Sequence, residues 1–210
     1  MKLSRFILFF LSVFSSQIVL AQTVTASTAA SKQGASISSP TYEIDTVYKI
    51  SEISFPGVTN NSSLSLSLDG SILAVGILNK GGTTQNKGHV RVFKYVRGSW
   101  DQLGGDINGE ADGDNLGSSI SLSSDGTILA VGANQFNRGD WKSGYVRVYQ
   151  YESGSWAQLG DDIVGEAEGD GSGSSISLSS DGTTLAVGAF RNGIYTTGHV
   201  RVYRYSGSSW

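Results

Sequence analysis

The chain has 210 residues, including 28 glycines, 2 prolines and no cysteine. The lack of cysteine excludes disulfides, thiolate metal sites and cysteine nucleophiles. The net charge of −3 provides no basic field to attract phosphate backbones, so we expect no nucleic-acid partner.

The first 21 residues have the pattern of an export signal. Lys2 and Arg5 supply positive charge, Phe6–Phe14 is an apolar run, and Val19-Leu20-Ala21 offers a small-residue cleavage site. The apolar run is too short to span a membrane. We therefore predict a signal peptide at 1–21, a secreted or cell-surface location, and no transmembrane span.

Two segments precede the regular part of the chain. Residues 22–41 are rich in Ser, Thr and Ala without apolar periodicity, which predicts a flexible leader. Tyr42–Phe55 alternates enough to form a strand, and we interpret residues 42–60 as a partial first repeat unit.

A 56-residue repeat organises the remaining sequence. Residues 117–133 and 173–189 differ at one position, where Ile128 is replaced by Thr184, and residues 61–77 are a more divergent copy. The Asp-Gly pairs of the three copies recur every 56 residues. The predicted units are therefore 61–116, 117–172 and 173–210, within a repeat region that covers 42–210.

One unit contains four strand signals and no competing helical period. The signals lie at Ser118–Ser123, Thr127–Ala133, Tyr145–Tyr151 and Trp156–Asp162. Asp125-Gly126 is typical of a type I′ hairpin turn between the first two strands. Four short strands at a fixed period predict an all-β fold of β-propeller blades, each a four-stranded antiparallel sheet.

At these motifs the units resemble the FG-GAP repeats of integrin α-subunit propellers, in a divergent microbial secreted form. The family's Phe-Gly corresponds to Leu116-Gly117 and Ser172-Gly173, and its Gly-Ala-Pro to Gly132-Ala133-Asn134 and Gly188-Ala189-Phe190. Neither the Phe nor the Pro is kept. The resemblance implies adhesion or ligand binding at the loop face of the propeller, and it implies no reaction.

The calcium loop of that family is reduced here to Ser-Ser-Asp-Gly, in which a single aspartate cannot supply the six to eight oxygens that calcium prefers. We interpret Asp125 and Asp181 as turn residues. The better calcium candidates are alternating carboxylates in the loops between units: Glu110, Asp112, Asp114, Glu166, Glu168 and Asp170. The alternative is that these loops are solvated connections whose charges keep the surface soluble.

Three further side-chain series recur once in each unit. His89 and His199 share a position with Tyr145, which indicates packing rather than catalysis or metal binding. Arg91, Arg147 and Arg201 share a strand face with the aromatic residues at 93, 149 and 203, which predicts guanidinium stacking between blades. Trp100, Trp156 and Trp210 are interpreted as core residues, with sugar stacking as the alternative.

No catalytic set accompanies these repeats, so we predict a non-enzymatic, secreted module for binding or adhesion, without a cofactor unless calcium binds. The expected partner is an extracellular protein or a glycan. The alternative is an accessory propeller of a secreted hydrolase whose catalytic part lies beyond residue 210. Propellers need about four to eight blades, so we expect a piece of a longer propeller. If the chain is complete, an open stack of blades favours self-association.

Overall fold

The structure is a computed structural model that describes residues 10–14, 17–21, 49–54, 58–80, 86–134, 136–137, 140–141, 143–191 and 197–210. The chain divides into two compact units, Met1–Phe55 and Pro56–Trp210. These described residues contain no helix. They therefore contain no helix that is long and apolar enough to cross a membrane.

The N-terminal unit contains one antiparallel sheet of three strands. Its strands β1 (Phe10–Phe14), β2 (Gln17–Ala21) and β3 (Lys49–Ser54) are hydrogen-bonded in that order. Two of them fall in the segment predicted to be a signal peptide, whose removal stays a prediction. The predicted flexible leader at 22–41 lies outside the described residues.

The C-terminal unit begins with a sheet that we call the first blade. It runs in the order β4 (Val58–Leu66), β5 (Ile72–Lys80), β6 (His89–Val96) and β7 (Ser99–Gln102), with the short β8 (Ile107–Asn108) also paired to β6. Every pairing is antiparallel. This is the four-stranded meander that the repeat predicts.

The second blade repeats this arrangement. Its order is β9 (Leu116–Leu122), β10 (Ile128–Ala133), β13 (Tyr145–Glu152) and β14 (Ser155–Gln158), with β15 (Ile163–Val164) also paired to β13. Of the fourth predicted strand, Trp156–Asp162, only residues 156–158 are in a strand, β14, and β15 begins directly after the predicted segment ends. Between β10 and β13, the two-residue strands β11 (Phe136–Asn137) and β12 (Asp140–Trp141) form a separate pair.

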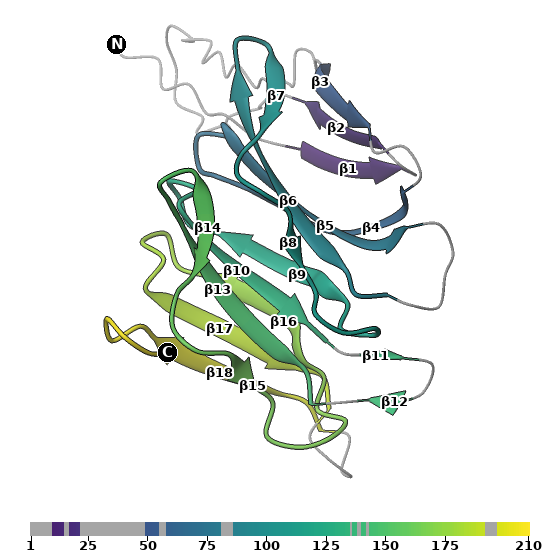
Figure 1. The fold of residues 1–210 in the computed structure, drawn as a ribbon, viewed down its shortest axis with the longest axis vertical. Coiled ribbons are helices and arrows are strands. Elements are labelled where there is room, and N and C mark those ends of the chain that lie inside the picture. The colour runs from purple at the N-terminus through teal and green to yellow at the C-terminus, as the bar shows by residue number, and fades with distance from the viewer. Residues whose placement is uncertain are drawn as a thin grey trace, which may run out of the picture. The chain divides into compact units, whose positions relative to one another are not determined.

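The third blade has three described strands, β16 (Ser172–Leu178), β17 (Thr184–Ala189) and β18 (His199–Arg204). The three blades lie face to face, one behind another (Figure 1). The antiparallel sheets confirm the prediction of an all-β fold.

The hydrophobic core lies between the blades because each blade is apolar on both faces. Ile120 and Leu122 of β9 stand opposite Val131 and Leu129 of β10, as predicted, and this face packs on the first blade. The other face of the second blade packs on the third. The buried side chains of this second interface, from both blades, are Ala130, Val146, Val148, Ile163, Leu178, Leu185 and Val187. Alternation of side chains along a strand produces this two-sided blade.

The Asp-Gly turn differs from the predicted type I′ turn, which needs positive φ at both central residues. Gly126 has φ 72°, but Asp125 is absent from the described non-glycine residues with positive φ. Asp125 Oδ1 instead accepts hydrogen bonds from Ser123 Oγ at 2.6 Å and from the Thr127 amide at 3.0 Å. The aspartate thus stabilises the turn through its side chain and leaves the left-handed conformation to glycine. Its role as a turn residue is confirmed.

Close backbone approach between blades requires glycine on β5 and β10. A Cβ atom at Gly132 would lie less than 3.0 Å from the carbonyl oxygen of Gly173 in the third blade, and Gly76 has the same relation to Gly117. Beside this contact, Ser119 Oγ donates to the Gly173 carbonyl at 2.7 Å. The contact recurs one unit earlier, where Ser63 Oγ donates to the Gly117 carbonyl at 2.6 Å.

Candidate binding cleft between the first two blades

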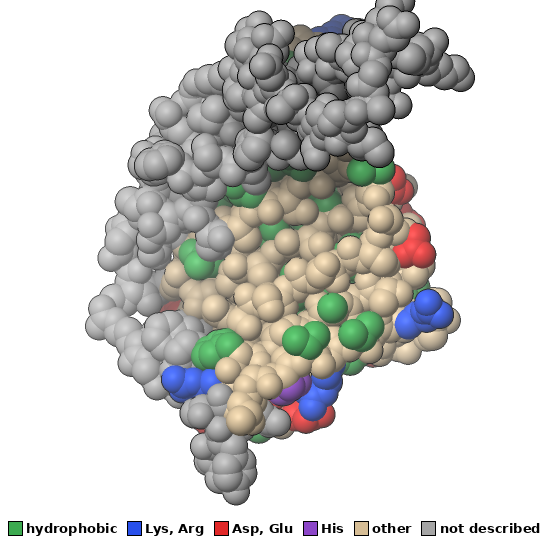
Figure 2. Space-filling model, turned by 180° about the vertical axis from the view of Figure 1, so that it is seen from behind, with side chains coloured by type: hydrophobic (Ala, Val, Ile, Leu, Met, Phe, Trp, Pro, Cys, Tyr) green, Lys and Arg blue, Asp and Glu red, His purple; other side chains and the backbone are tan. Residues whose placement is uncertain are grey.

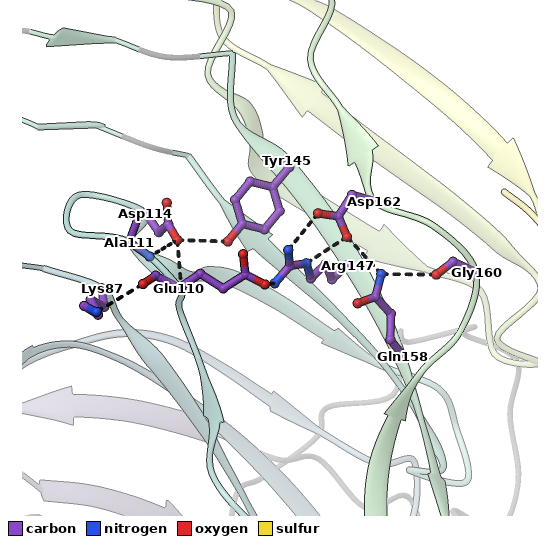
Figure 3. A network of polar contacts seen from close by, with 9 residues as sticks. All are labelled: Lys87, Glu110, Ala111, Asp114, Tyr145, Arg147, Gln158, Gly160 and Asp162. Atoms are coloured by element: carbon purple, nitrogen blue, oxygen red, sulfur yellow. Dashed lines mark hydrogen bonds and ion pairs between the residues drawn. The ribbon is translucent and has the colours of Figure 1, made fainter.

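Arg147 is the centre of a polar network between the first and second blades (Figure 3). It lies on β13, and its side chain is 12% exposed. Its Nε donates to Asp162 Oδ1 at 2.8 Å, and its Nη1 pairs with Glu110 Oε1 at 2.8 Å. The two carboxylates raise the pKa of Arg147, and the guanidinium lowers the pKa of Asp162. Both side chains therefore remain charged at neutral pH.

The pairing of Arg147 with Asp162 has a counterpart in the first blade, where Arg91 Nη2 pairs with Asp106 Oδ2 at 2.9 Å. In both blades a glutamine adds a further hydrogen bond to the aspartate. Gln158 Nε2 lies 2.9 Å from Asp162 Oδ1, and Gln102 Nε2 lies 2.7 Å from Asp106 Oδ1. Sequence reasoning missed these aspartates and glutamines, although their constant spacing from the repeated arginine was an available signal.

Glu110 and Glu166, two of the predicted calcium ligands, connect neighbouring blades instead. Glu110 pairs with Arg147 of the second blade, and Glu166 Oε2 pairs with Arg201 Nη2 of the third at 2.5 Å. Both glutamate side chains are more than half exposed. An acidic side chain in each loop thus joins its blade to the next.

Asp114 and Asp170 are the buried members of the predicted calcium sets, with exposed fractions of 4% and 0%. Asp114 Oδ2 accepts hydrogen bonds from the Glu110 and Ala111 amides at 3.0 and 2.8 Å, and from the Tyr145 hydroxyl at 3.3 Å. Asp170 Oδ2 accepts the equivalent bond from the Ala167 amide at 2.9 Å. Backbone amides therefore satisfy these carboxylates within the loop itself.

The remaining calcium candidates, Asp112 and Glu168, are exposed at the loop tips. Within the part of the chain that the structure describes, no group of three or more His, Cys, Asp or Glu side chains is placed to hold a metal ion. A calcium site needs six to eight converging oxygens, and the contacts described above do not provide that arrangement. Calcium binding at these residues stays a prediction.

The arginine series differs in part from the predicted stacking between blades. The guanidinium of Arg147 lies over the ring of Tyr145 at 4.8 Å, on its own strand, rather than in the stacking between blades that was predicted with position 149. Its contact between blades is the ion pair with Glu110. In the third blade, His199 takes the place of Tyr145 and contacts the guanidinium of Arg201.

The repeated tryptophans join neighbouring blades at their outer hairpins. Trp156 Nε1 donates to the Leu103 carbonyl of the first blade, and Trp210 Nε1 to the Leu159 carbonyl of the second, both at 2.9 Å. Trp156 is only partly buried, against the core between these two blades. Its indole therefore both packs in the core and offers a partly open surface.

A cleft of about 380 Å³ lies beside this network. The first blade and its following loop contribute Asp106 and Glu110, and the second blade contributes Arg147, Trp156 and Gln158. The cleft thus combines one aromatic surface with several hydrogen-bonding groups. Seen from the back, the described surface is mostly backbone and uncharged polar side chains, and its few charged side chains lie near the edge (Figure 2).

Two solved structures resemble this chain in fold. A hypothetical selenium-binding protein from Sulfolobus tokodaii matches with a TM-score of 0.54 and 14% identity, over 93% of this chain and 45% of its own. A protein from Lactobacillus plantarum matches with a TM-score of 0.51 and 13% identity, over 92% of this chain and 50% of its own. The chain therefore spans about half the length of these structures.

At such low identity the likeness shows the fold alone, which is all-β with propeller-type blades. No protein-family model matches the sequence, and no curated protein matches it. The finer assignment to FG-GAP repeats stays a prediction.

Proposed function

We propose that this chain is a non-catalytic binding module that acts outside the cell and holds a glycan in the cleft between its first two blades. The observation that carries the proposal is the cleft itself, where the partly open indole of Trp156 lies among hydrogen-bonding side chains. A sugar ring has an apolar face that stacks on indole and hydroxyl groups that need polar partners. The cleft offers both kinds of contact.

The groups of the cleft are already oriented, which favours binding. Among the side chains that line the cleft, Arg147 is held by Asp162 and Glu110, and Gln158 is held by Asp162. Asp106 is held by Arg91 and Gln102. Side chains fixed before a ligand arrives lose less conformational entropy when it binds. Gln158 also keeps an exposed side, as it belongs to the outer edge strand β14.

The same contacts favour binding over glycoside hydrolysis. A hydrolase of the common two-carboxylate type needs one carboxylic acid whose pKa is raised, so that it can protonate the leaving group. Arg91 lowers the pKa of Asp106, and Arg147 lowers the pKa of Asp162. Both aspartates are therefore suited to accept hydrogen bonds rather than to donate a proton.

A location outside the cell follows from the predicted signal peptide and from the resemblance to FG-GAP repeats, which also suggests adhesion. N-terminal sequencing of the protein recovered from the medium or the cell surface tests this part of the proposal. We expect the mature chain to begin at Gln22. A product that retains Met1 in the cytoplasm would contradict it.

A glycan array probed with the purified chain tests the binding itself, followed by calorimetric titration of the best ligand. Gln158→Ala should weaken binding at least about tenfold, because a hydrogen-bonding group of the cleft is lost. Gln102→Ala is the matched control. It removes the equivalent bonds from the first blade, and because Gln102 does not line the cleft and acts on it only through Asp106, we expect a smaller loss of affinity. Equal effects of the two substitutions, or no glycan bound, would refute the proposal.

A further inference from the structure

The face of the third blade that points away from the second blade is exposed, whereas the equivalent faces of the first two blades are buried. Val200 and Val202 on β18 are each 69% exposed. Their counterparts on β13, Val146 and Val148, are 0% and 1% exposed, because the third blade covers them. The same apolar pattern is therefore buried between blades at one position and exposed to solvent at the next.

A hollow of about 400 Å³ lies on this face, beside Ser175, Gly188 and Val200. Gly188 occupies the position of Gly132, whose missing side chain makes room for the Gly173 carbonyl of the following blade. Ser175 occupies the position of Ser119, whose hydroxyl donates to that carbonyl at 2.7 Å. The hollow thus has the shape and the donor that receive a glycine carbonyl at the preceding interface.

The remaining hydrogen-bonding groups of a blade interface are also present. Ser121 Oγ accepts a hydrogen bond from the Leu178 amide at 3.0 Å, and the Ser124 amide donates to the Ser180 carbonyl at 2.9 Å. Ser177 on the third blade holds the position of Ser121, and it is exposed. These bonds recur between the first two blades, where Leu122 N lies 3.0 Å from Ser65 Oγ and Leu68 N lies 2.9 Å from Ser124 O.

From these equivalences we propose that the outward face of the third blade is a docking surface for one further blade of the same 56-residue repeat. The docking blade presents a Gly-Ser-Ser-Ile-Ser-Leu strand whose first glycine places its carbonyl in the hollow at Gly188. The interface continues the two that the structure already contains, with the same valines and serines in the same places. This inference concerns assembly and does not depend on the proposed glycan cleft.

The absence of cysteine from the chain permits a direct test by thiol labelling. An extended chain carries a second copy of residues 157–210 after Trp210, since Trp210 holds the position of Trp156 in the repeat. In a Val200→Cys variant, a maleimide reagent should label the thiol at least about tenfold more slowly in the extended chain, because docking buries that position.

Three matched variants control the experiment. Val164→Cys should be labelled at the same rate in both chains, since Val164 is 57% exposed although the third blade already covers the second. Val148→Cys should be protected in both, since that side chain is 1% exposed. Adding Gly188→Leu to the extended Val200→Cys chain should restore fast labelling, because the new side chain fills the hollow.

Equal labelling of the Val200→Cys thiol in both chains would overturn the proposal. Loss of protection at position 148 in the extended chain would also overturn it, because a unit that docks through these contacts cannot unfold the blades that it covers. Sedimentation of the unextended chain, which measures its oligomeric state, tests whether a second copy of the chain covers this face instead of a further blade. A dimer that Val200→Asp abolishes would show that a second copy covers the face instead.

Discussion

Replacing Gly132 with alanine tests whether close backbone contact holds the second and third blades together. The added Cβ atom would lie less than 3.0 Å from the Gly173 carbonyl oxygen and 3.1 Å from the carbonyl carbon. Backbone atoms cannot rotate away, so the blades must separate. Separation also lengthens the 2.7 Å hydrogen bond from Ser119 to the same carbonyl.

The expected cost combines two terms. Overpacking costs about 1–3 kcal/mol, and loss of a hydrogen bond costs about 1 kcal/mol. We therefore expect Gly132→Ala to reduce the free energy of unfolding by about 2–4 kcal/mol. Urea unfolding followed by tryptophan fluorescence measures this change, since Trp156 and Trp210 each join two blades.

Gly188→Ala is the matched control, because Gly188 occupies the same position in the third blade. Its Cβ atom would meet the hydroxyl of Ser175, which can rotate, and no backbone atom closer than 3.4 Å. We expect a loss below about 1 kcal/mol. A Gly132→Ala variant that unfolds within about 0.5 kcal/mol of the parent chain, or no more easily than Gly188→Ala, would refute the argument.

The other predictions concern charge. The pKa of Asp181 is lowered to about 2 by its hydrogen bonds from Ser179 and Thr183, below the value of about 3.9 expected when unfolded. The stabilisation from the Asp181 carboxylate is therefore complete above about pH 4 and is lost as the pH falls through about 2. The melting temperature should fall less over this pH range in Asp181→Asn than in the parent chain. Arg147→Met should cost about 1–3 kcal/mol in urea unfolding, because it leaves two carboxylates without their partner, whereas the more exposed Arg91→Met should cost under about 1 kcal/mol; equal costs would contradict the central role of Arg147. Addition of about 5 mM calcium, or of a chelator, should leave the melting temperature unchanged, because the acidic loops bind backbone amides and arginines; a clear rise with calcium would restore the calcium hypothesis.

The strands and their pairing were predictable because each signal is local and occurs more than once. The alternation of Ile120 and Leu122 against Leu129 and Val131 identified both the hairpin and its buried face. The predicted turn type was wrong, also for a local reason. The Asp125 side chain accepts a hydrogen bond from the Thr127 amide and so favours a different backbone conformation. Preference for Asp-Gly alone does not distinguish these two turns.

Constant spacing marks the aspartates and glutamines of the polar network as repeated positions, but it does not show which side chains they meet. Arg147 and Asp162 are fifteen residues apart, and they meet because β15 folds back onto β13. Trp156 bonds to a carbonyl 53 residues earlier, through contact between blades. The roles of Glu110 and Asp114 likewise depend on a neighbouring arginine and on loop amides that only the folded chain brings near. Carboxylate spacing by itself therefore does not reveal these contacts.

The central claim is that the cleft between the first two blades holds the ligand, and the indole resonances of the tryptophans test it most directly. A proton–nitrogen NMR spectrum, recorded during titration with the best glycan from the array, separates the N–H signals of these side chains. We predict that the Trp156 indole signal shifts with saturation, while the Trp100 signal stays in place. A shift at Trp100 without one at Trp156, or no shift at all in the presence of excess glycan, would contradict the account.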